Sequence, residues 1–206
     1  DARMKKLLTE AVAIGNAVAR SNSLSPTRKS VFYYPDRQWY SSFPGTYDFM
    51  DKGELVLDNR ALWHFIATGV TPAMATPPVG QGSVYPCASK DSKGEYLDGG
   101  KSYTVTLPGP VPAKAFWSFT AYDGQTRSLL ETDQRTAGLD SLSKDVKANK
   151  DGSYTIHFGP KAPQEHEGNW VQTMPNKSYF VFLRLYGPLE AWFDKSWKPG
   201  DFELVK

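Results

Sequence analysis

The N-terminal part of the chain carries the three- and four-residue spacing of apolar positions that is typical of amphipathic helices. In MKKLLTEAVAIGNAVAR, residues 4–20, one apolar stripe is formed by Leu8, Ala11, Val12, Gly15, Val18 and Ala19. Gly15 and Ala19 are small enough to let another element approach closely. The following SLSPTRKS contains Pro26 and ends the helical pattern. The pattern therefore predicts a first helix with one apolar face.

A second helix is predicted in LDNRALWHFIATG, residues 57–69. Asp58 is expected to cap its start, and Gly69 is expected to end it in the left-handed conformation. The spacing gives this helix a core face of Ala61, Leu62, Phe65 and Ile66. Between the two helices, SVFYYPDRQWYSSFPGTYDF at residues 30–49 is aromatic and has no clean period. We expect it to form an extended segment that packs over another part of the chain.

The period of the apolar positions changes from about 3.6 to 2 after the Pro- and Gly-rich stretch TPAMATPPVGQGS. We therefore divide the chain into a helical and extended segment, residues 1–75, and a β domain, residues 76–206. Four segments of the second part read as strands: KSYTVTL, AFWSFTAY, SYTIHF after the turn signal NKDG, and SYFVFLRLY. Strands joined by turns predict a mainly β fold, an antiparallel jelly roll or β-sandwich with an N-terminal helical segment.

Composition and charge exclude several classes of protein. A chain of 206 residues is long enough to fold as one large domain without disulfides. The net charge is +2 and the charges are interspersed, which argues against nucleic-acid binding. No apolar run reaches the 18 residues of a membrane span. Cys87 is the single cysteine, so no internal disulfide and no cysteine-based metal site can form. The sequence opens with DARMKK and no signal peptide, and we expect that a leader or a whole preceding segment has been removed.

The three histidines lack the His-x-His spacing with which jelly-roll metal sites place two ligands on one side of a strand. The stretch EHEGNWVQTMP leaves one alternative open, in which His157 and His166 meet across a hairpin and Glu165 or Glu167 adds a third ligand. The sequence also has no Gly-x-Ser-x-Gly nucleophile elbow and no phosphate-binding loop. We predict neither a metal site nor a cofactor.

The stretch YDGQTRS, residues 122–128, has two interpretations. Asp123-Gly124 is a strong turn dipeptide, so the stretch first indicates a hairpin turn in which Arg127 begins the return strand. In the functional interpretation, Tyr122, Asp123 and Arg127 gather at the end of an aromatic strand and recognise a polar ligand.

Arg184 is the one charged residue in the most apolar predicted strand. Alternation places it on one face with Phe180, Phe182 and Tyr186. A buried charge must be paired, because an unpaired one costs several kcal/mol. Asp123 or Glu190 is the expected partner in a structural ion pair, and an anion-binding arginine is the alternative.

Long stretches of the chain are similar to a known bacterial family. They are LDNRALWHFIATGVTPAMA, YLDGGKSYTVTLPGPVPAKAFWSFTAYDGQTRSLLETDQ and FGPKAPQEHEGNWVQTMPNKSYFVFLRLYGPLEAWFDKSWKPGDFE, with GNAVARSN and FYYPDRQW nearer the start. Together they resemble the C-terminal half of bacterial two-domain proteins of unknown function. That half is the domain of unknown function 1214, usually preceded by the domain of unknown function 1254.

The resemblance implies a jelly-roll β-sandwich with a helical segment beside it, and a preceding domain that this chain lacks. It also implies a periplasmic or secreted location, and it supplies no catalytic residues. Within EHEGNWVQTMP, the NWVQT portion resembles the family motif and EHEG resembles a variable loop. Asn169, Trp170 and Gln172 therefore count for more than His166 as residues that edge a pocket.

These observations predict a ligand-binding or structural module of an exported bacterial two-domain protein. The alternative is an enzyme that acts on a small anionic or aromatic molecule in a jelly-roll pocket, with His64 or His157 as general base. A weaker third hypothesis is assembly through the aromatics of FYYPDRQWYSSF. Expected partners are the missing N-terminal domain or a second polypeptide and a small-molecule ligand, with homo-oligomerisation left open. The candidate ligand-binding residues are Tyr122, Asp123, Arg127, Asn169, Trp170 and Arg184.

Overall fold

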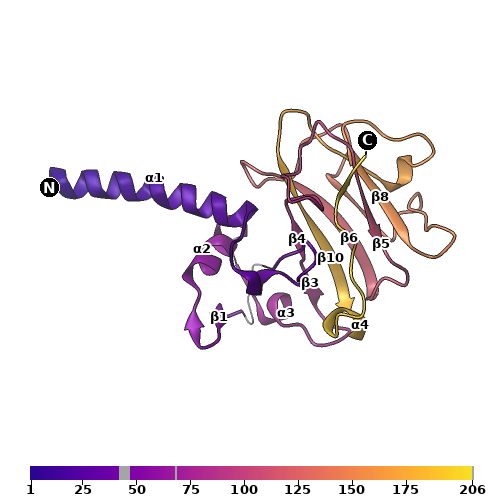
Figure 1. Ribbon diagram of the computed structural model, residues 1–206, viewed down its shortest axis with the longest axis horizontal. Coiled ribbons are helices and arrows are strands. Elements are labelled where there is room, and N and C mark those ends of the chain that lie inside the picture. The colour runs from indigo at the N-terminus through magenta and orange to yellow at the C-terminus, as the bar shows by residue number, and fades with distance from the viewer. Residues whose placement is uncertain (42–46, 68, 206) are drawn as a thin grey trace.

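Two β-sheets face each other in an open, sandwich-like arrangement, with helices on the outer side of one of them (Figure 1). The computed structural model describes residues 1–41, 47–67 and 69–205. The prediction of a mainly β chain with an N-terminal helix is confirmed. Part of the extended segment predicted at residues 30–49 and one residue of the second predicted helix lie outside the described residues.

The larger sheet is antiparallel and has the strand order β3-β10-β6-β7, with β4 also paired to β10. Its strands are β3 (Ser83–Val84), β4 (Cys87–Ala88), β6 (Ala113–Asp123), β7 (Gly138–Asp140) and β10 (Tyr179–Pro188). The long β6–β10 pair is in register from Asp123 opposite Tyr179 to Phe116 opposite Tyr186. Both strands of this pair were predicted from their runs of apolar and aromatic residues, and they are confirmed.

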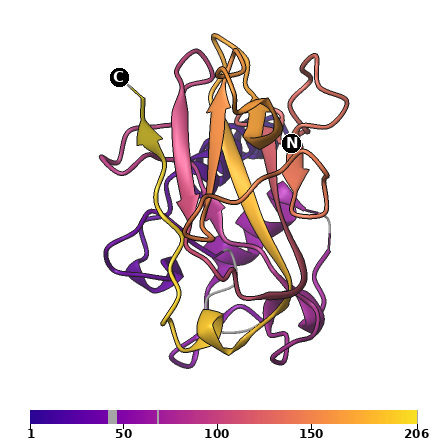
Figure 2. The same ribbon diagram turned by 90° about the vertical axis from the view of Figure 1, so that its right-hand side faces the viewer.

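The smaller sheet has the order β11-β5-β8-β9 and lies nearest to the viewer in the turned view of Figure 2. Its strands are β5 (Tyr103–Leu107), β8 (Tyr154–Gly159), β9 (Trp170–Gln172) and β11 (Glu203–Leu204). The β8–β9 pair is parallel, so the expectation of purely antiparallel pairing is wrong here. The reason lies in the connection: the loop after β8 and the 3-10 turn η2 (Glu167–Asn169) bring the chain back to run alongside β8 in the same direction.

The core lies between the two sheets, where the predicted alternation is confirmed. Tyr103, Val105 and Leu107 of β5 are buried, and the residues between them are exposed to different degrees. They pack with inward-facing residues of β8, β6 and β10: Ile156, Phe158, Trp117, Phe119, Ala121, Val181, Leu183 and Leu185. Burial of the Val, Leu, Ile and Phe side chains among them supplies about 1.5–3 kcal/mol each.

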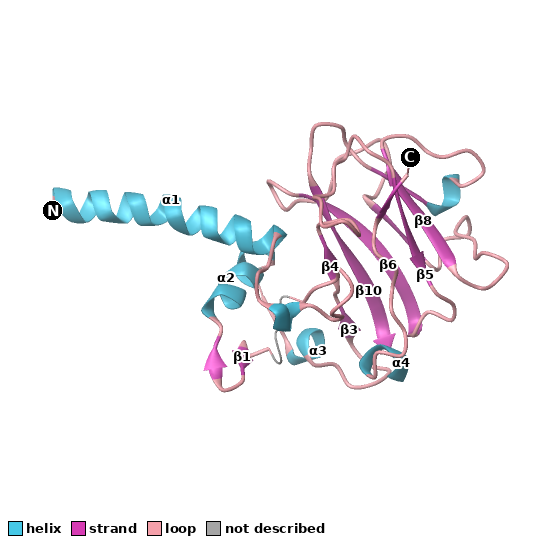
Figure 3. Ribbon diagram, viewed as in Figure 1, coloured by secondary structure: helices cyan, strands magenta, loops and turns pink. Residues whose placement is uncertain are grey.

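Two helices occur where they were predicted, α1 (Ala2–Leu24) and α2 (Leu57–Ile66), followed by the short helices α3 (Pro72–Ala75) and α4 (Glu190–Phe193). The carboxylate of Asp1 caps α1 by accepting the N–H of Met4 at 2.8 Å. The remaining short elements of this region are η1 (Lys29–Val31) and the strand pair β1 (Met50–Asp51) and β2 (Glu54–Leu55). The helices α1, α2 and α3 all lie on the outer side of the larger sheet (Figure 3).

The details predicted for α2 are partly wrong. Val56 stands at its N-cap position without a side-chain hydrogen bond, and Asp58 lies inside the first turn. The helix ends at Ile66 before Gly69, whose carbonyl oxygen instead accepts the indole N–H of Trp63 at 2.8 Å. The buried face contains Asn59, Leu62 and Trp63, whereas Ala61 is exposed. The helix is therefore rotated toward its tryptophan, because the larger side chain gains more from burial.

The apolar stripe predicted on α1 is exposed. Leu8, Val12 and Val18 keep 59%, 72% and 45% of their surface accessible, and Ser23 is the one residue of the helix that is buried. The C-terminal end of α1 lies close to α2, and the rest of the helix extends away from the sandwich (Figure 1). The stripe is thus amphipathic in sequence but has no partner within the described residues.

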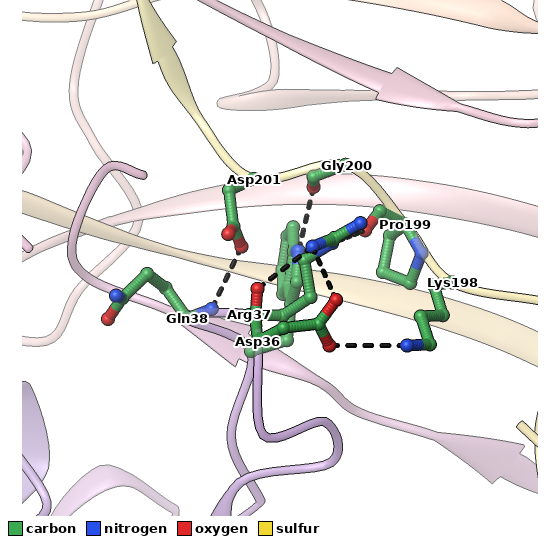
Figure 4. A network of polar contacts seen from close by, with 8 residues as sticks. Asp36, Arg37, Gln38, Lys198, Pro199, Gly200 and Asp201 are labelled. Atoms are coloured by element: carbon green, nitrogen blue, oxygen red, sulfur yellow. Dashed lines mark hydrogen bonds and ion pairs between the residues drawn. The ribbon is translucent and has the colours of Figure 1, made fainter. Parts of the chain in front are cut away.

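Residues 32–41, called the strap below, join the helical region to the sandwich. Tyr34 and Trp39 are fully buried in the core between the sheets. Figure 4 shows how the strap is fastened to the segment at residues 198–201: Lys198 contacts Asp36 at 3.2 Å, and the N–H of Gln38 donates to Asp201 at 2.9 Å. The indole N–H of Trp39 donates to the carbonyl of Gly200 at 2.8 Å. The domain division at residue 75 stays a prediction, and residues from before it pack in the sandwich core.

Within the described residues, no helix combines the length and apolar character needed to cross a membrane.

Truncation of Trp39 to alanine should lower the free energy of unfolding by about 3–5 kcal/mol, because it leaves a cavity where a fully buried ring stood. Urea denaturation followed by circular dichroism measures this change. Leu142→Ala is the matched control, since Leu142 is 69% exposed and its truncation should cost less than about 0.5 kcal/mol. Equal stability of the two variants would show that the strap is not part of the core.

Candidate functional site

The six residues predicted from the sequence fall into two separate groups. Tyr122, Asp123 and Arg184 lie on the long strands β6 and β10, with Arg127 in the turn that follows β6. Asn169 and Trp170 lie at the edge of the smaller sheet, beside β8. The structure therefore does not bring them into one site.

Arg184 lies on the outer face of the larger sheet and is half-buried. Its guanidinium group donates to the hydroxyl of Thr120 at 2.5 Å and to the hydroxyl of Tyr122 at 2.6 Å. Both partners come from β6, where alternation puts them on the same face as Arg184 of the neighbouring strand. This contact between Tyr122 and Arg184 is the part of the predicted site that the structure assembles.

Three aromatic rings surround the guanidinium. The centroids of Tyr85, Tyr122 and Phe182 lie 5.7, 5.9 and 5.8 Å from its central carbon. At these distances the ring faces attract a cation by about 0.5–2 kcal/mol each. Arg184, Thr120, Tyr122, Tyr85 and Phe182 are called the arginine cluster below.

The carboxylate partner expected for Arg184 is absent from the described residues, so the prediction of a structural ion pair with Asp123 or Glu190 is wrong. The ion pairs of the described chain involve other cations. Asp123 follows Tyr122 directly and therefore points to the opposite side of β6. Among the described residues, the positive charge of Arg184 is consequently held by hydroxyls and ring faces.

Asp123 organises the turn after β6, as the structural interpretation of YDGQTRS predicted. Its buried carboxylate accepts the N–H groups of Gln125 at 2.7 Å and Thr126 at 2.9 Å, and it forms an ion pair with Lys177. Burial acts to raise the pKa of Asp123, but the ammonium of Lys177 and the backbone N–H groups outweigh it and hold the pKa below its ordinary value. Asp123 is thus fully engaged in holding the turn.

Arg127 does not begin a return strand. Its backbone is left-handed, with φ of 64°, and the chain returns through a single bridge between Tyr122 and Leu129. Its guanidinium stacks over the ring of Phe65 in α2, 3.9 Å from the centroid. Arg127 therefore connects the turn to the helical region and stays outside the arginine cluster.

Asn169 fastens two loops together. Its amide oxygen accepts the N–H of Lys147 at 2.8 Å, and its amide nitrogen donates to the carbonyls of Lys147 at 2.9 Å and Thr155 at 3.0 Å. The indole N–H of Trp170 donates to the carbonyl of Gly159 at 3.0 Å. The backbone N–H of Gln172 donates to the amide oxygen of Gln134, and the side chain of Gln172 exchanges hydrogen bonds with Asp133. These contacts fix the start of β9.

His157 and His166 do meet, as the alternative left open by the sequence required, but across the connection between the parallel strands β8 and β9 and not across a hairpin. Their rings stack with centroids 4.9 Å apart, next to a polar cavity of about 500 Å³ that Asn169 and His166 help to line. Burial, with the neighbouring imidazole as a second cause, lowers the pKa of His157. Across the described part of the chain, no group of three or more His, Cys, Asp or Glu side chains is placed to hold a metal ion.

Two members of the arginine cluster were missed in the sequence. Thr120 was accessible to prediction, because it lies two residues before Tyr122 on the same strand face. Tyr85 was not, because the segment that contains it pairs with β10 across about one hundred residues of chain, and local patterns do not report such pairings.

A family model described as protein of unknown function (DUF1214) matches residues 82–190, a range that contains the whole arginine cluster. No curated protein matches the chain. Among solved structures, the chain is similar to the crystal structure of the VPA0106 protein from Vibrio parahaemolyticus, with 24% sequence identity and a TM-score of 0.56 over 75% of this chain and 36% of that one. It is also similar to an uncharacterized protein from Burkholderia cenocepacia, with 17% identity and a TM-score of 0.41 over 97% of this chain and 51% of that one. The chain therefore spans about a third and about half of their lengths. The first likeness supports the fold.

Replacement of Asp123 by asparagine should lower the free energy of unfolding at about pH 7 by about 1–3 kcal/mol, because charge-assisted hydrogen bonds are lost. Since the folded pKa is depressed, this stabilisation is present above the unfolded pKa of about 4 and is lost as the pH falls through the folded value. The gap between wild type and variant should therefore close on acidification, which urea denaturation across a pH series measures. The exposed Asp145→Asn is the control, and a gap that is constant with pH would contradict the prediction.

Proposed function

The chain belongs to the family described as protein of unknown function (DUF1214), and we propose that it acts as a ligand-binding module that holds a small anionic molecule at the arginine cluster. The observation that carries this proposal is the guanidinium of Arg184, which is half-buried and forms no ion pair among the described residues. A charge in this environment gains strongly from a counter-ion.

The neighbouring groups fit an anion with an apolar body. A guanidinium presents a planar fork that matches a carboxylate or phosphate. The hydroxyls of Thr120 and Tyr122 accept from Arg184, so each retains an O–H group that can donate to the same anion. The rings of Tyr85 and Phe182 flank the site and offer apolar contact to the rest of the molecule.

Binding is better supported than catalysis. The enzyme alternative requires a general base at the cluster. His64 lies on α2 with its Nδ1 at 2.9 Å from the carbonyl of Arg60, and His157 lies on the smaller sheet. The thiol of Cys87 is buried beside the hydroxyl of Tyr40, and burial raises its pKa to about 12, which keeps it protonated and unreactive.

We further propose that the chain is the C-terminal module of an exported, periplasmic or secreted bacterial protein with a second domain. The length of the similar chain from Vibrio parahaemolyticus, of which this chain covers 36%, supports a longer protein. A jelly-roll topology is the finer proposal for the fold, because the chain crosses between the sheets after β4, β5, β7, β9 and β10.

We additionally propose that a second polypeptide or a second copy of this chain covers the exposed apolar stripe of α1. Assembly through the strap is less favoured, because Tyr34, Trp39 and Tyr40 are buried within this chain.

Native mass spectrometry of the isolated protein, followed by titration with benzoate as probe, tests the binding function. Benzoate should shift the amide resonances of Thr120 and Tyr122, and Arg184→Met should weaken this binding about 10- to 100-fold, because the charge-assisted hydrogen bonds are lost. Arg127→Met is the matched control, since that guanidinium stacks on Phe65 outside the cluster. Unchanged binding in a folded Arg184→Met variant would refute the proposal.

A further inference from the structure

A second cavity of about 410 Å³ opens where the strap, the segment after α3, and α4 come together. Its volume is within the range of about 300–1,000 Å³ that small-molecule sites occupy. Its wall includes aromatic and aliphatic side chains, hydroxyl groups and one ammonium group, contributed by Tyr33, Thr76, Val84, Trp192, Phe193 and Lys195. Among the described residues that line it, Lys195 is the one charged side chain.

The ammonium of Lys195 is held over ring faces. Its nitrogen lies 4.7 Å from the ring centroid of Trp192, 4.9 Å from that of Tyr33 and 5.4 Å from that of Tyr34. The backbone of Lys195 is left-handed, with φ of 66°, a conformation that costs an ordinary residue about 1–2 kcal/mol. The packing around α4 therefore holds the Lys195 ammonium over these rings despite the free-energy cost of its left-handed backbone.

No carboxylate neutralises this ammonium in the part of the chain that the structure describes. Asp36 is engaged by Lys198 and Arg37 (Figure 4), and Asp194 accepts the N–H of Ser196 at 2.8 Å. Burial lowers the pKa of Lys195. Ring faces attract a cation but do not accept its hydrogen bonds as a carboxylate does, so the three N–H groups gain from an oxygen ligand.

The other residues that line the cavity indicate which kind of molecule provides this oxygen ligand. Trp192, Phe193 and Val84 give apolar contact. Burial raises the pKa of Tyr33 to about 12, so its hydroxyl is neutral at physiological pH and does not repel an anion. From this geometry we propose that the cavity binds a small aromatic carboxylate, with the carboxylate on Lys195 and the ring against Trp192 and Phe193. The site shares no residue with the arginine cluster and stands independently of it.

The test compares benzoate with benzyl alcohol, which has a ring of the same size and no charge. Benzoate should shift the indole N–H resonance of Trp192, and Lys195→Met should weaken that binding at least about tenfold, or about 1.4 kcal/mol, while benzyl alcohol binds as before. Arg184→Met should leave the Trp192 shift unchanged, so failure at one site is distinguished from failure at the other. Absence of a Trp192 shift in the wild type, or equal benzoate affinity in Lys195→Met, would overturn the proposal.

A pH series on the wild-type protein decides the question even where the lysine variant does not fold. Benzoate affinity at the cavity should fall as the pH rises through the range below the ordinary lysine pKa of about 10.4, because burial lowers the pKa of Lys195. Tyr33 and Tyr34 face Lys195 and have raised pKa values, so they stay neutral over most of this range, while Lys198, over the ring of Tyr34, adds only positive charge. Binding at Arg184 should persist, since arginine stays charged. A flat profile at Trp192 would refute the assignment to Lys195.

Discussion

The packing of Trp39 between the two sheets is the interaction on which the rest of the structure depends. Its ring is fully enclosed, and its N–H is satisfied by the carbonyl of Gly200. The strap is thereby fixed at its centre. On one side of Trp39, Tyr33 lines the cavity that contains Lys195. On the other side, Tyr40 exchanges backbone hydrogen bonds with Cys87 and donates its hydroxyl to the carbonyl of Ser23 at the end of α1.

The two candidate sites solve the same electrostatic problem in different ways. In each, a cation is partly withdrawn from water without a carboxylate among the described residues. Arg184 is held by two hydroxyls with rings beside it, whereas the contacts of the Lys195 ammonium within the described ranges are to ring faces. The arginine stays charged at any physiological pH, and the lysine is closer to losing its proton. Anion binding at the sheet face around Arg184 and in the cavity beside Lys195, as proposed above, would therefore differ in its dependence on pH.

Much of the fold was accessible from local pattern, because alternation and turn chemistry act over a few residues. The strands around Val105 and Leu183 and the turn at Asp123 follow from such signals. The predictions that were wrong concern which other segment of the chain packs against a given helix or strand. Apolar spacing identified the stripe on α1 but not that it is uncovered, and it ranked Ala61 above Trp63 on α2. Local periodicity does not encode contacts between distant segments. Such contacts determine the partners of Arg184, the parallel pairing of β9 with β8 and the cavity that contains Lys195.

The extension of α1 away from the sandwich sets its stability apart from that of the core. A helix of 23 residues is about 35 Å long, and near its N-terminus it has little except its own backbone hydrogen bonds and the Asp1 cap to hold it. Helices supported in this way are marginal in water and open with free energies near zero, whereas core strands open with free energies that approach that of global unfolding. The amide hydrogens of its first turns should therefore exchange with solvent orders of magnitude faster than those of β10, and any molecule that covers the apolar stripe will slow them. The rate of amide hydrogen exchange in the first turns of α1 therefore shows whether another molecule covers the apolar stripe.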